Sequence, residues 1–152
     1  MQAGRRAWIV TAGVVAAVAI AAAVIGVSAV RRWPARPAAV AGDPARGAKL
    51  YETLPCASCH DITRPWPGGA VCPNLGNIAT EADRIVRLPE YRGRAKDAAG
   101  YIRESIVDPD AYIVAGPSYR QDDGHSVMPK TFGQTLTPTQ LDDLVAFLLT
   151  RR

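Results

Sequence analysis

Hydrophobic and polar positions divide the chain into one long apolar run and a mixed remainder. Residues 7–30 form a run of 24 positions without a charged side chain, with arginines on both sides. A helix of this length spans about 36 Å, enough to cross the roughly 30 Å hydrocarbon core of a bilayer. A signal-peptide core is usually only about 7–15 residues long. The pattern therefore predicts a retained transmembrane anchor over 7–30, with a cleaved signal peptide as the alternative.

The mixed remainder predicts an all-α fold. One helix begins at Asp43-Pro44, a second covers about 97–107, and a third runs from a capping box at Thr137 to the C-terminus. A weaker pattern predicts a short helix over about 80–88. No stretch alternates between apolar and polar residues as a strand does, so no sheet is expected.

These patterns give four segments. They are the N-terminal residues 1–6, the predicted anchor at 7–30, a tether rich in proline and alanine at 31–42, and a predicted folded domain at 43–152. Extended at about 3.1 Å per residue, the tether reaches at most roughly 37 Å. The domain is therefore expected to stay near its own membrane.

The net charge of +4 belongs to the flanks of the apolar run. Five of the 18 basic residues stand beside it, and the chain from residue 37 onward carries 13 basic and 14 acidic side chains. A nucleic-acid-binding surface would need clustered positive charge in the domain itself. Composition therefore excludes nucleic acid as a partner and favours the lipid bilayer.

The folded domain has little material for a core. It holds about 110 residues joined by loops rich in proline and glycine, and the chain has only 2 phenylalanines. Domains of this size bury a smaller fraction of their surface than large ones. A bound cofactor is therefore expected to fill part of the interior.

Candidate chemistry centres on the motif CASCH at residues 56–60. A tetrahedral zinc site is one interpretation, because the three cysteines and either His60 or His125 could supply four ligands. A redox disulfide between Cys56 and Cys59 is another, but the thioredoxin-type site follows a strand, and none is predicted here. Neither alternative explains why a histidine directly follows the second cysteine.

Covalent haem explains every position of the motif. Cys56 and Cys59 would add to the two vinyl groups as thioethers, and His60 would present its imidazole to the iron. One haem c, attached through these two cysteines, is the predicted cofactor. Such attachment takes place outside the cytoplasm, so the motif predicts a cytoplasmic N-terminus and a haem domain on the periplasmic or extracytoplasmic side.

With this motif, the chain from residue 43 to the C-terminus resembles the class I cytochromes c. In that family an N-terminal helix with a glycine and an aromatic residue crosses a C-terminal helix with a leucine and an aromatic residue. The matching residues are Gly47, Tyr51, Leu144 and Phe147. The resemblance implies a class I cytochrome c fold around one covalent haem.

Further segments support the resemblance. In the CPNLGNI stretch, Pro73 and Leu75 match the family's proline and leucine, and the resemblance implies that the Pro73 carbonyl accepts the ring N–H of His60. Residues 127–129, VMP, are similar to the family's distal ligand motif. Residues 101–109, YIRESIVDP, are similar to a helix in the cytochrome domains of respiratory complexes.

Met128 is the candidate for the second axial ligand. The only other methionine, Met1, is predicted to lie on the opposite side of the membrane. His125 is the rival ligand, but it follows Asp-Asp-Gly, which predicts an exposed turn. A His/Met pair raises the reduction potential relative to two histidines. The predicted haem-binding residues are Cys56, Cys59, His60, Pro73 and Met128, of which His60 and Met128 bind the iron.

Five other residues have less defined roles. Cys72 is predicted to be a small buried residue beside the haem, with lipid attachment or an intermolecular bridge as alternatives. Four residues could reach the haem propionates. They are Arg64, Trp66, Tyr112 and Tyr119.

The predicted function is one-electron transfer by a membrane-anchored, monohaem cytochrome that is not itself an enzyme. The resemblance to respiratory cytochrome domains favours a subunit of a quinol-oxidising alternative complex III, with other subunits and redox proteins as partners. Cytochrome oxidase, nitric oxide reductase and a freely diffusing anchored carrier are alternatives. A haem enzyme or gas sensor with a labile Met128 is the alternative of a different class.

Overall fold

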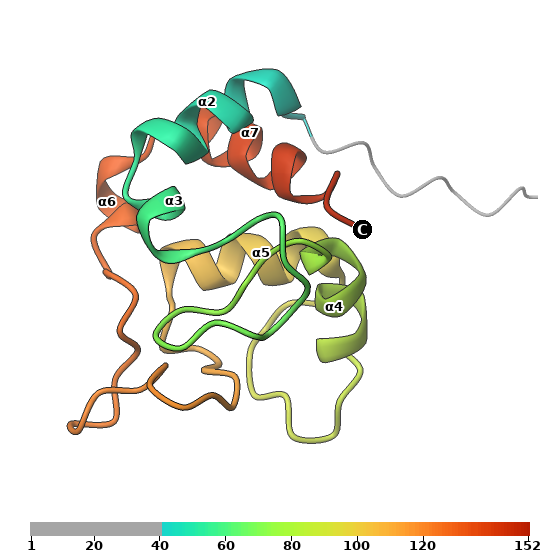
Figure 1. Cartoon of the computed structure of the whole chain (residues 1–152). Coiled ribbons are helices and arrows are strands. Elements are labelled where there is room, and N and C mark those ends of the chain that lie inside the picture. The colour runs from blue at the N-terminus through green and yellow to red at the C-terminus, as the bar shows by residue number, and fades with distance from the viewer. Residues whose placement is uncertain (1–40) are drawn as a thin grey trace, which may run out of the picture. The chain divides into compact units, whose positions relative to one another are not determined.

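The computed structural model describes residues 41–152, which form a helical domain (Figure 1). The predicted anchor at 7–30 and nearly all of the tether at 31–42 lie outside the described residues. Across 41–152, no helix has the length and apolar character needed to cross a membrane. The helices in chain order are α2 Pro44–Thr53, α3 Cys56–Cys59, α4 Ile78–Ile85, α5 Ala98–Val107, α6 Phe132–Thr135 and α7 Pro138–Leu148.

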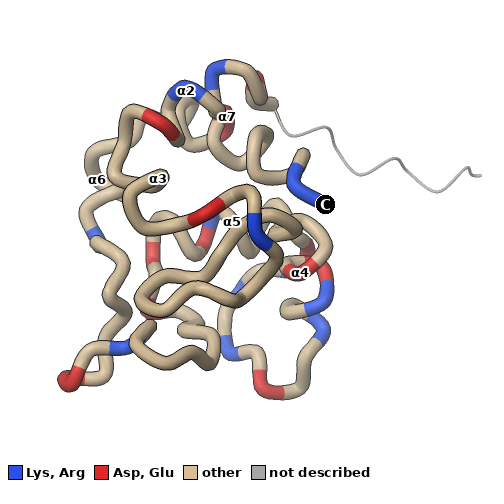
Figure 2. The backbone as a smooth tube through the Cα atoms, in the orientation of Figure 1, with Lys and Arg blue, Asp and Glu red and all other residues tan. Residues whose placement is uncertain are grey.

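The all-α prediction is confirmed within this domain. Its described residues contain no strand, and their one β-type pairing is an isolated antiparallel bridge between Arg120 and Ser126. Basic and acidic residues are interspersed along the backbone (Figure 2), as the balanced charge of the domain predicts.

The three helices predicted with clear start signals are present. Asp43 caps α2, because its carboxylate accepts the N–H groups of Ala45 and Arg46. Asp97 caps α5. At the start of α7, Thr137 and Gln140 form the predicted reciprocal capping box. These caps satisfy N–H groups that have no partner within a helix.

Other boundaries differ from the prediction. The weak pattern at 80–88 corresponds to α4, which begins two residues earlier, at Ile78, and ends at Ile85. The third helix ends at Leu148 rather than at the C-terminus. The four-residue helices α3 and α6 were not predicted, because a single helical turn is too short to display a period.

Helices α2 and α7 lie side by side (Figure 1) and make the most extensive contact between two helices of the domain. A Cβ atom on Gly47 would lie only 2.7 Å from the Phe147 Cβ and closer still to the Asp143 carbonyl oxygen, so only glycine fits there. One turn later, the rings of Tyr51 and Phe147 pack at 5.6 Å. The glycine and aromatic positions expected at this crossing are therefore in contact.

Helix α5 forms one wall of the domain interior. Tyr101, Ile102 and Ile106 are buried, and with Ser105 they line a cavity. Two long loops complete the enclosure, one from α3 to α4 and the other from α5 to α6. The residues that the sequence analysis assigned to the cofactor all lie on or beside these two loops.

Candidate functional site

His60 lies at the point where α3 ends. Its backbone N–H donates to the Cys56 carbonyl at 2.9 Å, and its own carbonyl accepts the Tyr51 hydroxyl. The ring Nδ1 lies 2.6 Å from the Pro73 carbonyl oxygen. The hydrogen bond that the resemblance implied between these two residues is therefore present.

This hydrogen bond determines the chemistry of the other ring nitrogen. A carbonyl oxygen can only accept, so Nδ1 of His60 must carry the proton that it donates to Pro73. Burial lowers the pKa of His60, with the Pro73 contact acting in the opposite direction, and the ring is neutral. Nε2 therefore keeps the lone pair that a metal ion requires.

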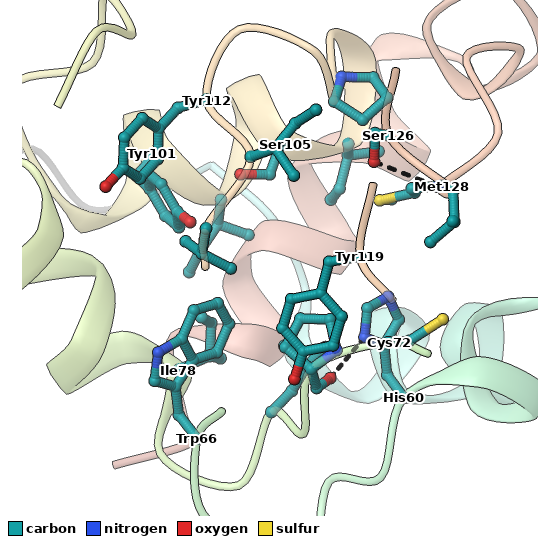
Figure 3. A pocket seen from close by; sticks show the side chains of 18 of the residues that line it. His60, Trp66, Cys72, Ile78, Tyr101, Ser105, Tyr112, Tyr119, Ser126 and Met128 are labelled. Carbon is teal, nitrogen blue, oxygen red and sulfur yellow. Dashed lines mark hydrogen bonds between the residues drawn. The ribbon is translucent and has the colours of Figure 1, made fainter. Parts of the chain in front are cut away.

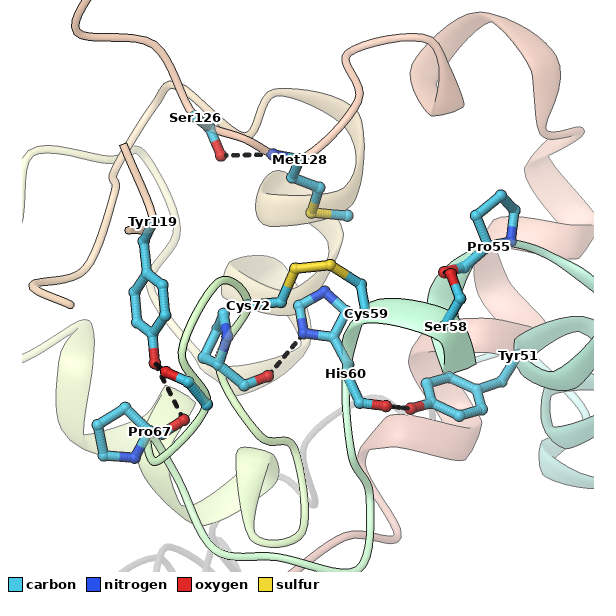
Figure 4. The surroundings of a disulfide bond; sticks show 12 residues. Tyr51, Pro55, Ser58, Cys59, His60, Pro67, Cys72, Tyr119, Ser126 and Met128 are labelled. Atoms are coloured by element: carbon cyan, nitrogen blue, oxygen red, sulfur yellow. Dashed lines mark hydrogen bonds between the residues drawn. A yellow bond between two sulfur atoms is a disulfide. The ribbon is translucent and has the colours of Figure 1, made fainter. Parts of the chain in front are cut away.

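Met128 lies across the cavity from His60 (Figures 3 and 4). Both side chains line its two connected parts. The Met128 backbone N–H donates to the Ser126 hydroxyl at 3.1 Å, which fixes the loop near the cavity. The remaining walls are mainly apolar and include Leu75, Ile78, Tyr101, Ile102, Ile106 and Leu148.

His125 does not line this cavity. Its side chain is 53% exposed, and its Nδ1 lies 2.8 Å from a carboxylate oxygen of Asp110. Gly124, just before it, adopts a left-handed backbone conformation with φ of 89°, typical of a glycine in a turn. Of the two candidates for the second axial ligand, the structure brings only Met128 to the cavity that His60 lines.

The cysteines of the motif occupy different surroundings. Cys56 is partly buried and lines the cavity with His60 and Met128, whereas Cys59 lies towards the exposed surface of α3. The buried Cys72 lines the other part of the cavity. Cys59 and Cys72 are joined in a disulfide, with their Cα atoms 5.6 Å apart (Figure 4).

Cys72 is buried, as predicted, whereas its pairing with Cys59 was not predicted. The loop between α3 and α4 returns to α3 and brings Cys72 within disulfide range of Cys59. A cysteine in a disulfide has no thiol to add to a vinyl group. In the haem-loaded protein, Cys59 would carry a thioether and would not be paired with Cys72.

The alternative chemistries of the motif lack the geometry they need. Among residues 41–152, no group of three or more histidine, cysteine, aspartate or glutamate side chains is arranged to hold a metal ion. A structural zinc site requires about four such ligands. The thioredoxin-type alternative needs a strand before the motif, and residues 41–152 contain no strand.

Three of the four residues considered for the haem propionates line the cavity: Trp66, Tyr112 and Tyr119. Arg64 does not, and its guanidinium lies 3.4 Å from the Asp61 carboxylate. The Tyr119 hydroxyl lies 2.8 Å from the Gly69 carbonyl oxygen and 3.1 Å from that of Pro67. Tyr119 therefore connects the loop that carries Met128 to the loop that carries Pro73.

The residues present fit a haem. The cavity combines mainly apolar walls, a neutral imidazole and a thioether on opposite sides, and a cysteine, Cys56, at its edge. Nitrogen and sulfur donors of this kind suit an iron porphyrin, and they leave no carboxylate to favour a hard cation.

Comparison with known proteins agrees with this chemistry. The family model for cytochrome c matches residues 44–152. No curated protein and no solved structure gives a significant match to the chain. The matched range begins at the first residue of α2 and includes the CASCH motif and Met128.

Proposed function

The chain belongs to the cytochrome c family, whose members bind haem c covalently through cysteines, and we propose that it transfers single electrons with His60 and Met128 as the two iron ligands. The observation that supports this proposal is the placement of both side chains on one apolar cavity. Haem supplies an iron that cycles between the ferric and ferrous states.

Each residue of the site contributes a defined part. Cys56 and Cys59 would attach the haem by adding their thiols to its two vinyl groups. Pro73 accepts the His60 N–H, which fixes the tautomer and the orientation of the ring. Met128 would be the second protein ligand to the iron and would leave no open position there for a substrate. A haem with two protein ligands would suit a carrier rather than an enzyme or a gas sensor.

The apolar walls have a second role. Their side chains exclude water from the neighbourhood of the iron, and a low-dielectric surrounding disfavours the more highly charged ferric state. A neutral thioether acts in the same direction. Together these features favour a relatively high reduction potential, which suits a carrier that receives electrons from quinol oxidation.

The proposal extends to location and partners. We infer that residues 7–30 anchor the protein in the cell membrane, with the haem domain on the periplasmic or extracytoplasmic side. The length of the apolar run supports the anchor, and covalent haem attachment supports this orientation. A short tether and the similarity of residues 101–109 to respiratory cytochrome domains favour a resident subunit of alternative complex III.

A redox titration of the purified, haem-loaded protein tests the carrier function. The absorbance change is expected to follow a one-electron Nernst curve and to reverse without loss of haem. Stopped-flow mixing with an oxidised c-type cytochrome is then expected to transfer the electron without any added substrate. Loss of haem during cycling, or turnover of peroxide or nitric oxide, would favour the enzyme alternative.

Two measurements on native membranes test location and partners separately. N-terminal sequencing of the mature protein is expected to find Arg5 and Arg6, and a terminus near Ala38 or Val40 would instead show cleavage. Purification in mild detergent is expected to recover the chain with other haem-containing subunits of a quinol-oxidising complex. Recovery with the catalytic subunit of an oxidase or a nitric oxide reductase would reassign the complex.

A further inference from the structure

We propose that Asp110 is a positioning residue that holds the loop carrying Met128 and keeps two competing nitrogen ligands away from the iron. This inference rests on the proposed role of Met128. Asp110 is not among the residues that line the cavity, so it would act through its neighbours rather than by contact with the cofactor.

One oxygen of Asp110 connects α5 to Met128 in two steps. Asp110 follows the buried Pro109, which lines the cavity just after the end of α5. Its Oδ1 accepts the Ser126 backbone N–H at 2.7 Å. The Ser126 hydroxyl in turn accepts the Met128 backbone N–H at 3.1 Å. The wall of the cavity and the proposed ligand are thereby joined through a single carboxylate.

The other oxygen of Asp110 holds two nitrogen bases. Its Oδ2 lies 2.8 Å from His125 Nδ1 and 2.5 Å from Lys130 Nζ. These residues stand three positions before and two positions after Met128. An imidazole or an unprotonated amine can bind haem iron, so each is a competitor that a loosened loop would bring within reach. Asp110 binds both of them on the exposed side of the loop.

Because His125 and Lys130 are exposed, their contacts with Asp110 contribute to the position of the loop more than to the stability of the whole fold. The His125 and Lys130 side chains are 53% and 51% exposed, and such ion pairs stabilise a fold only slightly. Ser126 is buried, so its charge-assisted bond to Asp110 is the stronger contact. Hydrogen bonds from Lys130, Ser126 and His125 lower the pKa of Asp110 to about 2, so it is charged at neutral pH.

The test is Asp110→Asn in the haem-loaded full chain. Asparagine has about the size of aspartate, but its NH₂ group cannot accept a hydrogen bond from Ser126, His125 or Lys130. The far-red sulfur-to-iron band of the ferric protein is expected to be weaker than in the parent. The fraction of ferrous protein that binds CO should rise at least about tenfold. This factor corresponds to the loss of one charge-assisted hydrogen bond. The free energy of unfolding should fall by no more than about 1.4 kcal/mol, which corresponds to the same tenfold factor.

Matched variants control the interpretation. Asp122→Asn removes an exposed carboxylate from the same loop that holds none of these groups, and it should behave as the parent. Ser126→Ala removes the hydroxyl that accepts the Met128 N–H, and it should weaken the far-red band in the same direction as Asp110→Asn. It also supplies the test if Asp110→Asn does not accumulate. Adding His125→Ala to Asp110→Asn should raise CO binding further, because one competing ligand is removed.

The outcomes distinguish this inference from the proposed function. If the parent shows the far-red band and excludes CO, and Asp110→Asn and Ser126→Ala do the same, the role of Asp110 is refuted while Met128 stands. If the parent itself lacks the band or binds CO readily, the assignment of Met128 fails and the inference fails with it.

Discussion

The two sides of the cavity are held by different kinds of contact. On the His60 side, backbone atoms take part in every contact, because His60 bonds through its N–H to Cys56, through its carbonyl to Tyr51, and through its ring to the Pro73 carbonyl. On the Met128 side, backbone bonds join Val127 to Tyr119 and Gln121 to His125. The N–H of Met128 itself bonds to the side chain of Ser126, which is held in turn by the side chain of Asp110.

The difference indicates how substitutions should act on each side. Backbone atoms remain when a neighbouring side chain is substituted. The contacts of His60 should therefore be lost mainly when a whole helix or loop moves. Contacts that depend on one hydroxyl or one carboxylate disappear with a single substitution. We therefore expect the ligand set to be robust at His60 and easily altered at Met128.

The largest effect is expected for attachment itself. Cys56→Ala removes the cysteine that already lines the cavity with His60 and should reduce stably bound haem to a small fraction of the parent level. Acid acetone should extract no haem from the parent, because thioether bonds survive that treatment. Pyridine haemochrome spectra of the purified proteins measure both quantities.

Cys72→Ala is the matched control, since Cys72 is bonded to Cys59 but lies outside the motif. It should keep covalent haem, and peptide mapping should find haem on Cys56 and Cys59. In the haem-loaded parent, the unfolded chain should then present one titratable thiol, that of Cys72. Haem mapped to Cys72 in place of Cys59 would contradict the assignment.

Met128→Ala should break the other side of the cavity without releasing the haem. The thioethers and His60 remain, so the haem content should match that of the parent. Loss of the sulfur ligand should abolish the far-red band and lower the reduction potential by on the order of 0.1 V, within the roughly 0.8 V range that axial ligands span. Optical redox titration measures this change.

His125→Ala is the comparison for that variant. Its side chain is half exposed and does not line the cavity, so the far-red band and the reduction potential should match those of the parent. The opposite pattern, in which His125→Ala loses these properties and Met128→Ala keeps them, would make His125 the ligand.

Gly47→Ala should disturb the His60 side of the cavity by moving helix α2. The added methyl group would overlap the Asp143 carbonyl and crowd Phe147, which forces α2 away from α7. Overpacking of this kind costs about 3 kcal/mol at the upper end of its usual range. Chemical denaturation should show this loss, whereas Lys49→Ala on the exposed face of α2 should change stability by less than about 0.5 kcal/mol.

The smallest effect is expected on the pH dependence of the stability that the contact between α2 and α7 provides. Hydrogen bonds from Arg46 and from the Asp43 N–H hold the pKa of Asp143 below its usual value. A depressed folded-state pKa stabilises the fold above the unfolded value near 4, and the stabilisation is lost as the pH falls. Asp143→Asn should therefore be less stable than the parent at pH 7, and the difference should shrink below about pH 4.

Thermal unfolding at several pH values measures this difference. Glu52→Gln, an exposed substitution on α2, serves as the control and should leave the pH dependence unchanged. A gap between parent and Asp143→Asn that is the same at pH 3 and pH 7 would show that the Arg46 contact does not contribute through the charge of Asp143.

The sequence predicted the parts of this structure that local chemistry determines. The caps at Asp43, Asp97 and Thr137 each act within three residues along the chain, so the starts of α2, α5 and α7 could be read directly. The contact between Gly47 and α7 is long-range. It could be anticipated only through the resemblance to a known family, and not from periodicity.

The parts that could not be predicted depend on how the loops fold back. Cys72 is 13 residues from Cys59, and Asp110 is 16 residues from Ser126. Nothing in the local pattern pairs these residues, because the proline- and glycine-rich loops have no period from which a register could follow. Asp110 carries a weak signal in hindsight, as an acidic residue just after the end of α5.

Exposure of the reduced, haem-loaded protein to CO tests the central claim most directly. If His60 and Met128 hold both axial positions of a haem attached through Cys56 and Cys59, the ferrous spectrum should remain unchanged over minutes at neutral pH. Rapid appearance of the ferrous CO spectrum in the parent would mean that one axial position is open or weakly held. That result would contradict the carrier assignment and favour the haem enzyme or gas sensor.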